Sequence, residues 1–170
     1  MLSQSPDTLL IEFHLTLGEM IKGYQQLMSI LQKEKTLIIE GNTGELISCL
    51  IQKEGAITLL NRLEARRQTE IEGIGKVLGL VDRPLTFSMI IEIVREPFKS
   101  KFYACKASLE ALTASMIEVN QMNGLLVDRT LRKISDLIGL LKQISTVSLT
   151  YSSTGAVNPY PASGRTLVRT

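Results

Sequence analysis

Hydrophobic residues recur at spacings of three and four along most of this chain, which is the pattern of helices that pack through one face. The first run opens at Ser5-Pro6-Asp7, where a capping serine precedes two residues that favour the first turn of a helix. Its apolar positions form one seam: Leu10, Phe13, Leu17, Met20, Tyr24, Leu27, Leu31 and Ile38. Glu34 also falls in this seam, so we expect its carboxylate either to reach solvent or to pair with a cation.

A second helix is predicted after the Gly-Asn-Thr-Gly break at 41–44, running antiparallel to the first. Asn42 with Glu45 three residues later resembles a capping box. The packing face predicted for this helix is interrupted by Lys53 and consists of Leu46, Leu50, Ile57, Leu60 and Leu63. Glycines between 73 and 79 each cost about 1 kcal/mol in a helix interior, so we expect the helix to fray or end there.

A long last helix is predicted from residue 98 to about 146. Before it, Asp82-Arg83-Pro84 indicates a loop, Thr86 can cap a short helix from Phe87 to Arg95, and Pro97 either ends that helix or starts the next. The long helix keeps a heptad seam through Phe102, Cys105, Leu109, Leu112, Met116, Val119 and Leu126. At about 1.5 Å per residue it would be roughly 70 Å long, more than the first two helices can cover.

The pattern therefore predicts an all-α fold, an elongated antiparallel helical bundle over residues 1–147, with a flexible tail over 148–170. Composition agrees, because 44% of the 170 residues are hydrophobic but only 5% aromatic, with no Trp. The tail is rich in Ser, Thr, Gly and Pro, which bury too little apolar area to offset the entropy of ordering. Charge is uneven, since residues 1–128 hold 13 basic and 16 acidic groups and residues 129–170 hold 6 and 1.

Candidate catalytic and metal-binding residues are few, so we expect no enzyme, no cofactor and no metal. The lone histidine, His14, has no nucleophile or carboxylate at a spacing that suggests catalysis, and we expect it at a surface or boundary position. Cys49 and Cys105 form no CxxC pair and are expected as reduced core residues. The acidic residues of 64–72 lack a histidine at metal-ligand spacing, and no phosphate-binding loop pattern occurs.

Basic residues give no strong indication of nucleic-acid binding. Arg62, Arg66 and Arg67 alternate with acidic residues, which is typical of a solvated, partly paired helix face, and the net charge is only +2. The first residues carry no basic stretch or cleavage site of a signal peptide, and apolar runs are far shorter than the roughly 20 residues needed to span a bilayer. We expect a cytoplasmic protein without membrane insertion.

A rotated apolar stripe near the end of the long helix is the main candidate for function. It begins beyond Asn123-Gly124 and consists of Leu131, Ile134, Ile138, Leu141 and Ile144. One interpretation is ordinary core or the seam of a homodimer, as in a structural coiled-coil protein that associates with itself. The other is a docking face for an amphipathic helix of another protein. Periodicity alone does not decide between them.

Several segments in a characteristic order resemble the FlgN family of flagellar export chaperones. They are Glu34 followed by Gly41-Asn42-Thr43-Gly44-Glu45-Leu46, then Lys53-Glu54 with Leu59-Leu60-Asn61-Arg62-Leu63-Glu64, then Asn120-Gln121-Met122-Asn123-Gly124-Leu125-Leu126, and finally Thr150-Tyr151 with Gly155. Each segment alone is common in coiled coils, whereas their order and spacing across most of the chain are specific.

This resemblance implies a cytoplasmic chaperone that binds the C-terminal amphipathic segments of hook-associated junction proteins and escorts them to the flagellar export gate. By position, client binding would fall on the stripe from Leu131 to Ile144. The resemblance also implies that Tyr151, just past the last helix, contacts the export gate.

Overall fold

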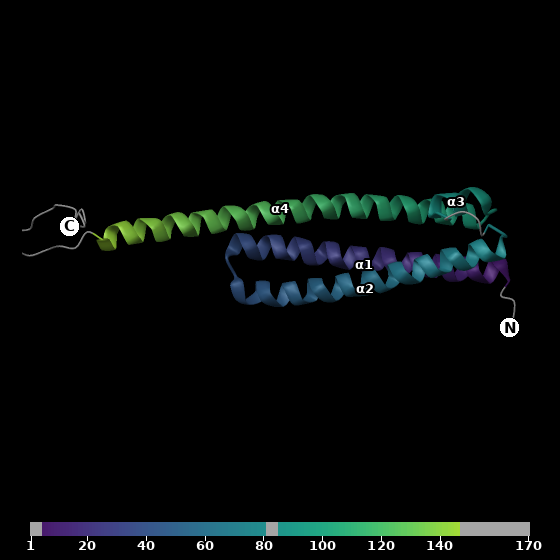
Figure 1. Cartoon of the computed structure of the whole chain (residues 1–170), viewed down its shortest axis with the longest axis horizontal. Helices are drawn as coiled ribbons and strands as arrows, with labels where there is room; N and C mark the ends of the chain where they lie inside the picture. Colours follow the sequence, from purple (N-terminus) through teal and green to yellow (C-terminus); the bar gives the residue numbers. More distant parts are fainter. Residues whose placement is uncertain (1–4, 81–84, 147–170) are drawn as a thin grey trace, which may run out of the picture. The chain divides into compact units, whose positions relative to one another are not determined.

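The computed structural model describes residues 5–80 and 85–146, except for the side chains of 144–146. This part consists of helices joined by irregular segments. Its helices are α1 (Pro6–Glu40), α2 (Thr43–Val77), α3 (Phe87–Ile93) and α4 (Phe98–Thr146), as Figure 1 shows. The predicted all-α class and the long last helix are confirmed. The chain divides into two compact units, Met1–Leu126 and Val127–Thr170. The predicted tail at 148–170 lies outside the described residues, so its boundary stays a prediction.

Helices α1 and α2 form an antiparallel hairpin in the first unit (Figure 1). The side chain of Ser5 accepts a hydrogen bond from the Thr8 amide at the start of α1, as the sequence predicted. At the turn, Gly41 adopts a left-handed conformation with φ of 69°, which a glycine reaches without steric cost. Asn42 then caps α2 by accepting from the Glu45 amide at 3.2 Å.

The face that α2 packs against α1 is rotated from the predicted one. Leu50 and Ile57 were expected inside, but they are 45% and 41% exposed. The buried positions of α2 along the hairpin include Cys49, Ala56, Leu60 and Leu63. Lys53 lies four residues after Cys49 and three before Ala56, so it falls on the same helix face as these buried residues, while the two larger residues turn outward.

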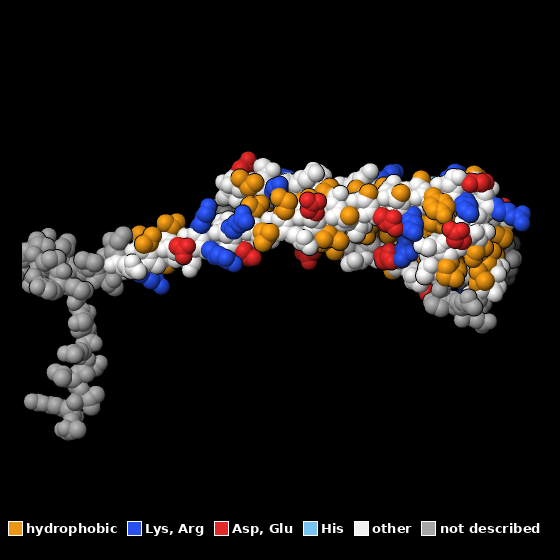
Figure 2. Space-filling model, turned by 90° about the horizontal axis from the view of Figure 1, so that it is seen from above, with side chains coloured by type: hydrophobic (Ala, Val, Ile, Leu, Met, Phe, Trp, Pro, Cys, Tyr) orange, Lys and Arg blue, Asp and Glu red, His pale blue; other side chains and the backbone are white. Residues whose placement is uncertain are grey.

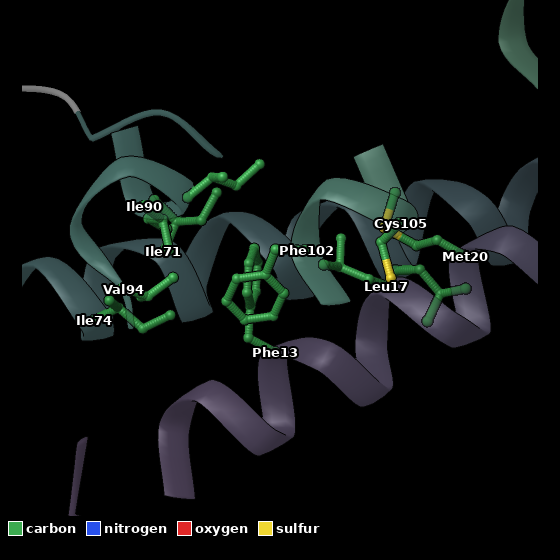
Figure 3. Packing of buried hydrophobic residues seen from close by; sticks show 11 residues of the cluster. Phe13, Leu17, Met20, Ile71, Ile74, Ile90, Val94, Phe102 and Cys105 are labelled. Carbon is green, nitrogen blue, oxygen red and sulfur yellow. The ribbon is translucent and has the colours of Figure 1, made fainter. Parts of the chain in front are cut away.

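An aromatic cluster closes the end of the hairpin opposite the Gly41 turn. The ring of Phe13 on α1 meets the rings of Phe87 and Phe102 edge to face, at centroid distances of 5.4 and 5.3 Å. Figure 3 shows Phe13 against Phe102, between a group that includes Ile71 and Ile90 and one that includes Leu17 and Met20. Edge-to-face aromatic pairs stabilise such cores beyond simple burial. This cluster joins all four helices within the first unit.

The region between the hairpin and α4 contains one short helix. Helix α2 ends at Val77, within the glycine-containing stretch where the sequence predicted its end. Thr86 caps α3 by accepting from the Met89 amide, as predicted, and α3 ends at Ile93, two residues before the expected Arg95. The predicted loop at 82–84 lies outside the described residues.

Candidate functional site: the exposed face of the last helix

A partly buried polar cluster attaches α4 to the hairpin within the first unit. The Lys53 ammonium group on α2 donates to both oxygens of Glu34 on α1, at 3.1 and 3.0 Å, and to Oδ1 of Asn120 on α4 at 3.1 Å. The amide nitrogen of Asn123 donates to the Leu31 carbonyl and to Glu34 Oε2, both at 2.9 Å. Of the two environments predicted for Glu34, pairing with a cation is the one observed.

Asn123 is the residue of this cluster that the sequence did not reveal. Its side chain is 3% exposed, in line with the seam that Phe102 and Cys105 begin, and its Oδ1 has no hydrogen-bond partner among the described residues. A lone buried asparagine in an apolar helix seam fixes the register of the helices, because any shift leaves its amide unpaired. The first part of α4, up to Leu126, therefore has one defined register on the hairpin.

Beyond this unit, α4 continues as a helix whose apolar side chains are exposed. In the part of the chain that the structure describes, Leu131 and Leu141 are 59% and 64% exposed, and Ile134 and Ile138 are 48% and 47% exposed. Their spacing of three, four and three places these four predicted residues on one helix face. The helix backbone includes Ile144, whose side chain lies outside the described residues, as does Tyr151.

The apolar face is wider than the predicted stripe. Val127 extends it by one turn, and Leu137 and Leu140 lie beside it, 59% and 55% exposed. Together these positions cover about half of the circumference of a helix with 3.6 residues per turn. The predicted stripe follows one heptad seam and therefore leaves out Leu137 and Leu140. A helical wheel over the same residues includes them.

The charged positions of the same segment are mainly basic. Residues 127–146 contain four cations, Arg129, Arg132, Lys133 and Lys142, and two anions, Asp128 and Asp136. All six are exposed. Within the described residues, no ion pair joins either aspartate to Arg129, Arg132 or Lys133. The helix thus offers a broad apolar side and a polar side of net positive charge.

Other candidate residues take structural roles in the described part of the chain. Arg66 pairs with Glu70 at 2.9 Å and Arg67 pairs with Glu64 through a short contact, which confirms the solvated, partly paired face. His14 is partly exposed and lies beside the aromatic cluster. No group of three potential metal ligands occurs in the described ranges. No described helix is long and apolar enough to cross a membrane.

The two cysteines are free and buried, as predicted. Burial raises the pKa of the Cys49 thiol, and the nearby Glu34 carboxylate raises it further. Burial alone raises the pKa of the Cys105 thiol. A raised pKa keeps both groups in the less nucleophilic thiol form at neutral pH.

Two concave regions among the described residues of the first unit are lined mainly by apolar side chains. One lies at the α3 end between Leu10, Ile74 and Phe98, with a volume of about 380 Å³. The other, of similar volume, lies between α2 and α4, and its lysine is Lys53, which is already paired.

Comparison with known proteins gives one result. The family model described as FlgN protein matches residues 9–159, which is most of the chain. No curated protein and no solved structure gives a significant match.

Proposed function

The chain belongs to the FlgN family of flagellar export chaperones, and from that premise we propose that it binds the C-terminal amphipathic segments of hook–filament junction proteins and delivers them to the export apparatus. Its client-binding residues in this proposal are Leu131, Ile134, Ile138, Leu141 and Ile144. Other export substrates of the same amphipathic class would use the same face.

The exposure of the stripe is the observation that carries this proposal. Side chains that are 47% to 64% exposed have apolar surface left to bury. Anchors at helical spacing are the usual way in which a protein recognises an amphipathic helix. A client segment that would otherwise self-assemble through its own apolar stripe can be held by an equivalent stripe of the chaperone.

The size of the face fits a reversible complex. Burying about 600 Å² of apolar surface at about 25 cal/mol/Å² supplies up to about 15 kcal/mol before costs. Loss of rotational and translational freedom and the ordering of the client consume much of this energy. A micromolar to nanomolar complex is what a chaperone that must later release its client needs.

The test is the double substitution Ile134→Asp with Ile138→Asp, assayed by pull-down with a junction-protein C-terminal peptide. We expect capture to fall at least a hundredfold, because two central anchors would be replaced by charges. Ile47→Asp with Ile51→Asp is the matched control, since these α2 residues are 62% and 66% exposed and lie outside the stripe. Equal loss in both variants, or unchanged capture in the first, would contradict the assignment.

Contact of Tyr151 with the export gate is the second part of the proposal. It is supported by the family and by the position of this tyrosine in the sequence, five residues after α4 ends at Thr146. Tyr151→Ala should weaken binding to the gate and leave client capture unchanged. Loss of both activities together would count against a separate gate contact.

Self-association through the stripe is the competing interpretation. Light scattering separates it from client binding, because an obligate dimer with no affinity for junction-protein peptides would indicate a structural coiled coil. A monomer, or a dimer that the peptide dissociates, supports the chaperone function.

A further inference from the structure

A single client helix would leave part of the apolar face of residues 127–143 uncovered. Two-helix seams bury residues at alternating spacings of three and four, which here are Leu131, Ile134, Ile138 and Leu141. Leu137 and Leu140 fall outside that seam and are 59% and 55% exposed. The width of the face is therefore greater than its proposed client requires, and the remainder needs a different explanation.

Charge limits what can cover this face. Lys142 borders the apolar half of the helix, and Lys133 lies within that half, between Leu137 and Leu140 on the helical wheel. Such long side chains can keep their charge in water while their stems cover apolar surface. Arg132 lies on the opposite, polar side, and Arg129 lies at the edge of the apolar half, next to Leu140 on the helical wheel. Figure 2 shows hydrophobic and basic side chains together on the segment of α4 next to the grey residues. A surface that covers this face should be apolar where it contacts the leucine and isoleucine side chains, and negatively charged where it meets the cations.

The excess of positive charge is confined to this end of the chain. Residues 127–146 hold four basic and two acidic groups, whereas residues 1–126 hold 13 and 15. A helix with a broad apolar side and long cationic side chains along its edges and polar side is typical of helices that lie in the interface of a bilayer.

We propose that the segment 127–146 lies on an anionic lipid surface, with Leu137 and Leu140 facing the acyl chains and its cations among the headgroups. This binding is parallel to the membrane plane and needs no spanning helix. Lipid binding goes beyond client capture. The pull-down measures client capture without lipid, so the lipid-binding proposal and the client-binding proposal can each fail alone.

The chain contains no tryptophan, so a single introduced tryptophan reports its own environment. Leu140→Trp should shift its emission to shorter wavelength when vesicles containing phosphatidylglycerol are added. Leu59→Trp on α2 is the control, because Leu59 is also exposed, at 47%, but lies in the acidic first unit. We expect no shift for the control, and no shift for either variant with vesicles of phosphatidylcholine alone.

Neutralising the cations tests the electrostatic contribution to vesicle binding. Each cation near an anionic bilayer is worth about fivefold in affinity, so Arg129→Gln, Arg132→Gln and Lys133→Gln together should weaken co-sedimentation with phosphatidylglycerol vesicles about a hundredfold. The matched control removes three exposed cations of the first unit, through Lys22→Gln, Arg62→Gln and Lys76→Gln. The control should retain binding within about fivefold.

Three outcomes would overturn the proposal. They are an unshifted Leu140→Trp emission with anionic vesicles, equal binding to neutral vesicles, and equal loss in the two triple variants. The cations would instead be assigned to a protein partner if two results came together: the unchanged chain binds no vesicles, and the variant with Gln at 129, 132 and 133 loses junction-peptide capture.

Discussion

Replacing Lys53 by methionine should destabilise the first unit far more than an ordinary surface substitution. Lys53 lies 3.0 Å from Glu34 Oε2, and the Glu34 side chain is only 8% exposed. The variant keeps the length of the side chain but leaves the carboxylate buried with Asn123 as its remaining donor. A buried charge without its counter-ion cannot recover its lost hydration.

The expected loss is about 2–3 kcal/mol. Breaking a buried ion pair by removing one partner typically costs about 3–5 kcal/mol. The Lys53 side chain is 21% exposed, so water screens the pair in part, and the Asn123 hydrogen bond remains to the carboxylate. With a urea dependence of about 2 kcal/mol/M, the unfolding midpoint should fall by about 1 M.

Urea unfolding followed by circular dichroism at 222 nm measures this loss. Lys22→Met is the matched control, because Lys22 is exposed on α1 and forms no ion pair among the described residues. Adding Glu34→Leu to the Lys53 variant removes the stranded charge and should return stability to within about 1 kcal/mol of the unchanged chain. If the Lys53 and Lys22 variants unfold within about 0.5 kcal/mol of each other, the cluster does not stabilise the fold as argued.

Two further predictions concern the backbone and the thiols. Gly55→Ala should raise the free energy of unfolding by up to about 1 kcal/mol, since an added Cβ would meet no atom within 4 Å. Gly41→Ala should lower it by about 1–2 kcal/mol, because the φ angle of Gly41 is 69°. Urea unfolding of both variants measures the two changes, and changes of the same sign would contradict the conformational argument. Burial raises the pKa of Cys49 and Cys105 above the ordinary 9.0, so the fold favours neutral thiols. This stabilisation is complete below pH 9.0 and is lost as pH rises through the raised pKa values. The unfolding midpoint should therefore fall more steeply above pH 9 than in a variant with alanine at both positions, and parallel curves would show that the thiols contribute nothing.

The seam of α1 could be predicted because its apolar residues are large and regularly spaced. Phe13, Leu17 and Leu31 are all at most 2% exposed, as that pattern requires. The face of α2 could not, because its buried positions include Cys49 and Ala56, which weigh little in a hydrophobic pattern. Lys53 interrupts the apolar pattern of α2, although its pairing with Glu34 makes it part of the seam. Such pairing between helices is not visible in the periodicity of either helix alone.

The candidate site was predictable to the extent that its apolar residues recur at helical spacing. The stripe from Leu131 to Leu141 has this spacing, and its side chains are exposed. The heptad description missed Leu137 and Leu140 because it selects one seam and ignores neighbouring positions. The apolar pattern of α4 changes at Asn123, but the hydrogen bonds of this residue depend on atoms of α1 that only the tertiary structure brings near.

The distribution of polar groups along α4 differs between its two parts. Up to Leu126 its seam contains Asn123, whose hydrogen bonds to α1 fix one register. From Val127 to Leu141 the seam holds only aliphatic residues, so no buried polar group would specify how a partner must align. A helix or a lipid surface can satisfy such a face through apolar contact alone, whereas a face with a buried amide would reject every partner without a matching group. The absence of a register-fixing residue in this seam therefore favours a chaperone that accepts more than one amphipathic client.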